Sequence, residues 1–130
     1  MVIMVPKGRR GGNMSKTYFG FALADSMFAN LPNGTAIRRF VRTPEFVREL
    51  VGQDIESCLN PSHAATIVAM RERFGINVSI PTVPPRVELQ PGDSMVVMGV
   101  RGLPRLTDRH EYSAEEISSA TFAFSLYEVE

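Results

Sequence analysis

The sequence predicts a compact single domain of the α/β (α+β) class, with a mixed β-sheet that is flanked by helices and contains a β-hairpin. Hydrophobic patterns with strand and helix periods follow in the order strand, strand, helix, helix, hairpin, helix, strand. The chain has 130 residues, of which 44% are hydrophobic, enough for one core. No repeat, low-complexity tract or internal linker divides it.

Two segments near the start of the chain are predicted strands. In residues 17–24 the bulky side chains of Phe19, Phe21 and Leu23 alternate with smaller ones, so one face of this strand is nearly bare. A bare face allows a second backbone or a ligand to approach closely. Residues 35–41 form the second predicted strand, which follows an Asn-Gly turn signal.

The next segment carries the marks of a helix over residues 44–51. Thr43 is a suitable N-cap, Pro44 suits the first helical position, and Gly52 ends the pattern. Residues 54–59 are ambiguous between a loop and a short strand.

Two more helices are predicted from their capping residues. The segment from 61 to 74 follows Asn60, a good N-cap, and closes at Gly75. A short helix later in the chain is opened by a capping box formed by Ser113 and Glu116.

Residues 86–101 are predicted to form an antiparallel hairpin that turns at residues 91–93. The second half, residues 95–100, is almost wholly apolar, so we expect this strand to be covered on both faces. The alternating residues 121–129 predict a final strand.

Composition limits the partners and the compartment. Fourteen basic residues balance fourteen acidic ones, so no duplex DNA partner is expected and any anion site must be local. The single cysteine, Cys58, excludes an intrachain disulfide and a cysteine-based metal cluster, and we expect no metal and no cofactor. No apolar run is long enough to predict a membrane span. The scarcity of cysteine favours a cytoplasmic location. Residues 1–15 are predicted to be a flexible basic N-terminal extension, and residues 16–130 the folded domain.

His63, near the start of the second helix, allows two interpretations. It shares a helical face with Ile67, Met70 and Phe74, which is typical of a histidine that is hydrogen-bonded in the core. It also lies in the first helical turn, where unpaired N–H groups and the helix dipole attract phosphate. A phosphate there would favour the imidazolium, which can donate a proton. A Cys58–His63 nucleophile pair lacks an orienting third group.

The other polar candidates are arginines. Arg101, Arg105 and Arg109 are spaced by four in a loop that also holds Asp108. Such a loop is either a solvated surface or a clamp on phosphate oxygens, which guanidinium groups suit. Arg86 lies on the polar face of its predicted strand, where a surface charge is the ordinary expectation. No familiar nucleotide-hydrolase or metalloprotease motif is present.

The order and spacing of five segments resemble a known family, the small viral ring nucleases that act as type III anti-CRISPR proteins. The resemblance runs from about Tyr18 to Val129. It is carried by ALADSMFANLP, HAATIVAMRERFG, RVELQPGDSMVVM, RLTDRHEYSAEEI and FSLYEV.

The resemblance implies a metal-independent ribonuclease that cleaves the cyclic tetra-adenylate messenger to linear products with a 2′,3′-cyclic phosphate. It implies a C2 homodimer with the ligand between the protomers. In this arrangement His63 would protonate the departing 5′ oxygen, Arg105 would stabilise charge on the phosphorane, and Asp108 would orient Arg105 or its loop.

Four further residues are predicted to bind the ligand. These are Ser26, Thr66, Arg86 and Arg101. Phe21 and Ala24 stand where the family has polar residues. Two alternatives therefore stay open: a dimer that binds a cyclic oligoadenylate or another RNA without cutting it, and a structural dimer in which His63 is a core residue.

Overall fold

The structure is a computed structural model that describes residues 15–107 and 111–130. The predicted extension over residues 1–15 therefore lies, except for Ser15, outside the described residues. Lys16 is already tied to the fold. Its N–H donates to the Asp93 carboxylate at 3.0 Å, and its carbonyl accepts from the Ser94 N–H at 3.0 Å.

A five-stranded mixed sheet forms the centre of the domain, as the sequence predicts, with strand order β2-β5-β4-β1-β3. Strand β1 pairs in parallel with both β3 and the central β4, whereas β5 pairs antiparallel with β4 and β2. The strands are β1 (Thr17–Gly20), β2 (Ile37–Arg42), β3 (Glu56–Ser57), β4 (Ser94–Arg101) and β5 (Thr121–Val129).

The helices are α1 (Pro44–Val51), α2 (Ala64–Phe74) and α3 (Ala114–Ser119), with 3₁₀ turns η1 (Asp25–Phe28) and η2 (Pro61–His63). Their predicted caps are present. The Thr43 hydroxyl accepts from the Phe46 N–H at 3.1 Å, the Ser113–Glu116 capping box is closed, and Gly75 ends α2 with a φ of 70°. None of the described helices is long and apolar enough to cross a membrane.

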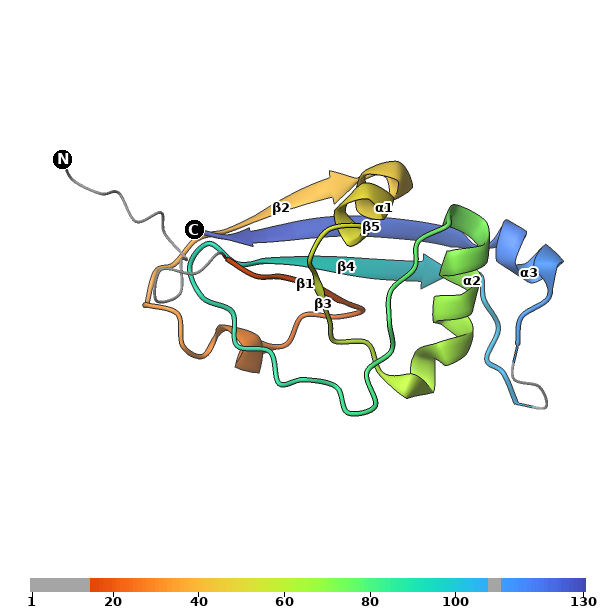
Figure 1. The fold of residues 1–130 in the computed structure, drawn as a ribbon, viewed down its shortest axis with the longest axis horizontal. Coiled ribbons are helices and arrows are strands. Elements are labelled where there is room, and N and C mark those ends of the chain that lie inside the picture. The colour runs from red at the N-terminus through yellow and green to blue at the C-terminus, as the bar shows by residue number, and fades with distance from the viewer. Residues whose placement is uncertain (1–14, 108–110) are drawn as a thin grey trace.

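Helices α1 and α2 cover the same face of the sheet (Figure 1). Beneath them lie Phe19, Val96 and Phe124 from three neighbouring strands, together with Val47 of α1 and Met70 of α2. Each of these five side chains is at most 1% exposed. Burial of a large apolar side chain contributes ~1.5–3 kcal/mol, so this helix-side cluster is the main core.

A second cluster covers part of the opposite face. Tyr18, Met95 and Val129 point to this side, and Val87 and Leu89 pack onto them from the segment that precedes β4. Because β4 sends alternate side chains to both clusters, its first half is covered on both faces. The expectation that the whole of residues 95–100 is covered in this way is wrong at Gly99, which is exposed.

The predicted hairpin over residues 86–101 is wrong in its first half. Its turn forms, and the Asp93 N–H donates to the Gln90 carbonyl at 2.9 Å. Residues 86–90 nevertheless form no strand, because both edges of β4 are already paired, with β1 and with β5. The segment instead lays its alternating apolar side chains across the sheet.

The predicted first strand over residues 17–24 is also too long. It ends at Gly20, because its neighbour β3 contributes only Glu56 and Ser57. From Phe21 onward the chain bends away from the sheet.

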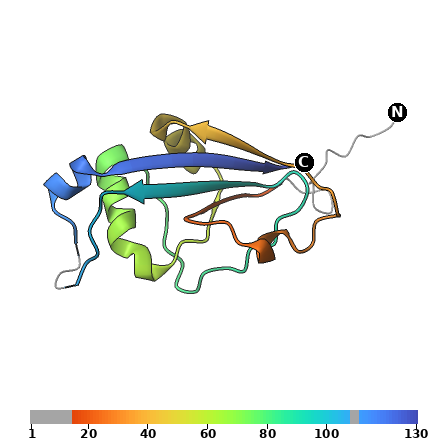
Figure 2. The ribbon, with the colours of Figure 1, turned by 180° about the vertical axis from the view of Figure 1, so that it is seen from behind.

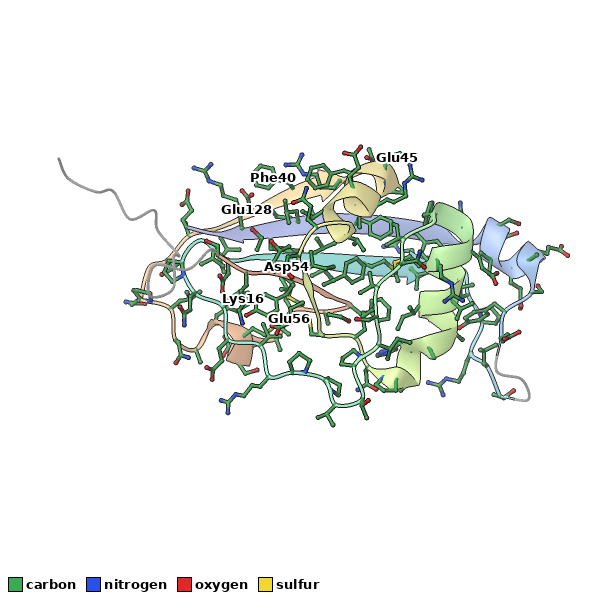
Figure 3. All side chains as sticks on the ribbon, viewed as in Figure 1. Lys16, Phe40, Glu45, Asp54, Glu56 and Glu128 are labelled. Carbon is green, nitrogen blue, oxygen red and sulfur yellow. The ribbon has the colours of Figure 1, made fainter. Side chains whose placement is uncertain are left out.

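Beyond the second cluster, part of the face of β2, β5 and β4 away from the helices is left open (Figure 2). On β2, Phe40 lies beside α1 (Figure 3) and packs against the helix-side cluster. Val41 therefore points the other way and is 70% exposed. Gly99 and Ala123, paired on β4 and β5, are also exposed, and a Cβ added at Gly99 would meet nothing within 4 Å. We call Val41, Gly99 and Ala123 the open sheet face.

Candidate functional site

The candidate site lies where three parallel strands end. The chain leaves β1 at Gly20, β3 at Ser57 and β4 at Arg101, and these are the carboxyl ends of the strands. Open sheets with parallel strands usually bind ligands outside this edge. The segment after β3 leads into η2 and α2, whereas the segment after β4 forms the loop before α3.

These two segments enclose a hollow of about 560 Å³. It is lined by His63 and Thr66 at the start of α2 and by Arg105 in the loop after β4. Leu103 and Leu106, both half-buried, form part of its wall. The structure thus brings together three of the residues that the sequence singled out, from segments about forty residues apart.

The interpretation of His63 as a core residue is wrong. His63 is exposed, at the end of η2 and directly before α2. No described residue makes a hydrogen bond to its ring. Instead, the ring of Phe21 packs edge-on against the imidazole, with centroids 5.0 Å apart and planes at 74°. This aromatic contact restrains the imidazole without using its nitrogens in a hydrogen bond to a described residue.

The helix end differs from the one predicted. The sequence places His63 within a regular first turn with unpaired N–H groups, but residues 61–63 form a 3₁₀ turn. The Ser62 N–H donates to the Asn60 side chain at 2.9 Å, and the His63 N–H donates to the Asn60 carbonyl at 2.9 Å. The Ala64 N–H donates to the Pro61 carbonyl. An anion in the hollow would therefore depend on side chains more than on these three backbone groups.

Arg105 supplies the positive side chain of the hollow. Its loop is not helical, as Gly102 and Pro104 predict, and Gly102 opens it with a φ of 89°. The Arg105 side chain is exposed and forms no ion pair with any described residue. Asp108, predicted to orient Arg105, lies outside the described residues.

The other three predicted ligand-binding residues do not line this hollow. Ser26 lies exposed in η1, and Arg101 is the exposed last residue of β4. Arg86 is largely exposed and its Nε lies 3.3 Å from a Glu88 carboxylate oxygen. Within one protomer these residues are therefore separate from His63 and Arg105.

Sequence reasoning missed two hydroxyl groups in the hollow, those of Ser62 and Tyr112. Ser62 directly precedes His63, so its proximity was available from the sequence. Tyr112 directly precedes the capping box of α3, and only the path of the loop after β4 brings it to α2.

Cys58 is unsuited to act as a nucleophile. Burial, reinforced by the charge of Glu56, raises the pKa of its thiol to about 11. The thiol also donates to the Phe19 carbonyl at 3.0 Å. Since the thiolate is the nucleophilic form, a Cys58–His63 pair is disfavoured at neutral pH.

The chain matches no known protein-family model, and no curated protein is significantly similar to it in sequence. Among solved structures, it is similar to B116 of Sulfolobus turreted icosahedral virus. The two share 19% sequence identity with a TM-score of 0.62, over 88% of this chain and 99% of the viral one. At this identity the similarity shows a shared fold, and that fold occurs in a protein of an archaeal virus.

Proposed function

We propose that this protein is a metal-independent ring nuclease that cleaves cyclic tetra-adenylate and so antagonises type III CRISPR immunity in the host cytoplasm. The observation that carries the proposal is that His63 and Arg105 line one hollow. A proton donor for the departing oxygen and a cation near the phosphorane both accelerate cleavage of a phosphodiester by its own ribose. The viral occurrence of the fold and the five sequence segments support the same conclusion.

In the proposed reaction, a ribose 2′ oxygen forms a bond to the neighbouring phosphorus while the bond from phosphorus to the 5′ oxygen breaks. The 2′-hydroxyl proton passes to solvent, and His63 donates a proton to the departing 5′ oxygen. Arg105 stabilises the negative charge that accumulates on the phosphorane oxygens. The products are a 2′,3′-cyclic phosphate and a free 5′-hydroxyl.

In this proposal the ligand is also bound by the hydroxyl groups of Ser62, Thr66 and Tyr112, three residues that line the same hollow. Hydroxyls can donate to phosphate oxygens or accept from ribose hydroxyls. They add fixed polar groups around the reacting phosphodiester without adding charge.

One observation favours the second candidate, a protein that binds a cyclic oligoadenylate or RNA without cutting it. Phe21 and Ala24 replace polar residues of the resembled family, and the Phe21 ring occupies one flank of His63. Incubation with labelled cyclic tetra-adenylate separates the two functions. Tight binding with the ring still intact after extended incubation would favour sequestration.

The first prediction concerns metal. Cleavage should proceed at the same rate in EDTA, because the proposed chemistry uses only side chains. Among residues 15–107 and 111–130, no three His, Cys, Asp or Glu side chains gather closely enough to hold an ion. Product chromatography with and without chelator measures this. Loss of cleavage in EDTA, restored by one divalent ion, would contradict the mechanism.

The proposed ligand also implies a homodimer, since a ring of four identical nucleotides can share a twofold axis with two protomers. The open sheet face supports a dimer contact, because Val41 and Ala123 expose apolar side chains and Gly99 is exposed near the carboxyl end of β4. A partner packed there would cover it.

We therefore expect a solution mass of about twice 14.4 kDa. Ala123→Arg should give a monomer, because it places a charge in the contact, whereas Ser118→Arg, on exposed α3, should stay dimeric. Light scattering after size exclusion, with and without the ring, measures both. A wild-type chain that is monomeric in both conditions would rule out the shared site.

A further inference from the structure

His63 also lines a second and smaller cavity, of about 190 Å³. Its other walls come from the ends of β1 and β3, from η1 and from β4. The residues that matter are Gly20, Phe21, Ala22, Met27, Cys58 and Met95. We call this the apolar cavity, to distinguish it from the hollow that holds Arg105.

The end of β1 allows this cavity to form. A Cβ at Gly20 would come within 2.6 Å of Met95 Cε and 3.0 Å of Cys58 Sγ. Glycine at this position therefore lets these two side chains pack directly against the strand, whereas a Cβ would require the end of the Met95 side chain to shift. At Gly20, the predicted bare face of this strand is thus filled by the Met95 and Cys58 side chains. Ala22, two residues further along the same face, is exposed and lines the apolar cavity.

Apart from His63 and Asn60, the side chains that line the cavity are apolar or, in Cys58, a neutral thiol. The Cys58 thiol stays protonated near neutral pH, since burial raises its pKa to about 11, and it donates to the Phe19 carbonyl. The rings of Phe21 and His63 offer aromatic surface. Met27 and Met95 are unbranched and adapt to the shape of a ligand.

The volume of the apolar cavity and one polar residue in its lining limit the kind of ligand that it can bind. Pockets for drug-sized ligands usually enclose ~300–1,000 Å³, so a cavity of about 190 Å³ takes one ring system and little else. Asn60 also lines it, and its side-chain oxygen already accepts from the Ser62 N–H at 2.9 Å. Its amide N–H groups therefore remain to donate to an acceptor such as a purine ring nitrogen.

We propose that the apolar cavity binds one heterocyclic base of the ligand whose phosphodiester lies between His63 and Arg105. This inference rests on the proposed function for the identity of that ligand. A nucleotide joins an anionic phosphate to a flat, largely apolar base, and His63 lines both the polar hollow and the apolar cavity. The base site holds the ring by stacking and by burial, whereas the hollow carries out the chemistry.

The test uses two uncleavable probes, cyclic tetra-deoxyadenylate and the same ring with abasic sugars, and binding is measured by calorimetry. Ala22→Phe fills the cavity from its exposed rim, while Ala29→Phe places the same ring at an exposed position that lines neither cavity. We expect Ala22→Phe to weaken binding of the adenine ring ~5- to 150-fold, the range that stacking of one base covers. It should leave binding of the abasic ring unchanged, and Ala29→Phe should bind both rings as the wild type does.

A ring with 2-aminopurine in place of adenine provides a second measurement. Stacking against Phe21 and His63 should quench its fluorescence in the wild type, with less quenching in Ala22→Phe. Equal binding of the adenine ring by Ala22→Phe and wild type, without quenching, would overturn the base site while leaving the proposed function intact. A wild-type protein that binds neither ring would overturn both.

Discussion

His63→Ala should slow single-turnover cleavage of cyclic tetra-adenylate by at least ~100-fold, the usual scale for removal of a general acid. A departing alkoxide leaves slowly without a proton, so the loss should appear in the chemical step rather than in binding. The melting temperature should change little. His63 is exposed and its ring makes no hydrogen bond to a described residue, so the alanine variant leaves no buried polar partner unsatisfied.

Rate, ligand affinity and melting temperature should be measured on one preparation. His63→Gln is the matched variant, since it keeps a polar side chain but cannot act as an acid near neutral pH; it should be as slow as the alanine variant. If both variants cleave at the wild-type rate, His63 is not the acid. If the wild type and both variants bind cyclic tetra-adenylate but none of the three cleaves it, the protein binds the ligand without cutting it.

Arg105→Ala should slow cleavage by ~10²–10³-fold, the range found when one donor to a developing oxyanion is removed. Ligand affinity should fall much less, because the charge on phosphorus oxygens is greatest in the transition state. Arg105→Lys should cleave at a rate between those of the wild type and Arg105→Ala, since lysine keeps the positive charge but lacks the planar guanidinium group. Folding should be unaffected, since Arg105 is exposed and forms no ion pair with a described residue.

Arg71→Ala is the control for a general loss of positive charge, because Arg71 is exposed in the last turn of α2 and lines neither cavity. It should cleave at the wild-type rate. Equal losses in Arg71→Ala and Arg105→Ala would indicate long-range attraction of the anion. In that case Arg105 would have no specific place beside the phosphorane.

Local structure was predictable because its signals lie within a few residues. The Thr43 cap and the Ser113–Glu116 capping box each satisfy N–H groups one turn away, so the pattern alone determines them. Gly75 likewise ends α2 in a left-handed conformation that glycine adopts without strain. The same locality explains why the mixed sheet with helices was correctly predicted as a class.

Strand pairing was not predictable in the same way. Residues 86–90 alternate like a strand and precede a turn, yet both edges of β4 are taken by β1 and β5. The competition between partners far apart in the chain decided the pairing, and a local pattern contains no information about it. The alternating pattern nevertheless identified the buried residues of this segment, since Val87 and Leu89 pack in the second cluster.

The sequence by itself determined the candidate residues: one histidine in a capped helix start, and an arginine-rich loop kept non-helical by Gly102 and Pro104. The tertiary structure decided that His63 is exposed beside Phe21 and that Arg105 shares its hollow. Helical periodicity indicates which residues share a face but not whether another element covers that face. Met70 is fully buried against the sheet, whereas His63, two turns earlier on the same face, is exposed, so only part of this helical face is core.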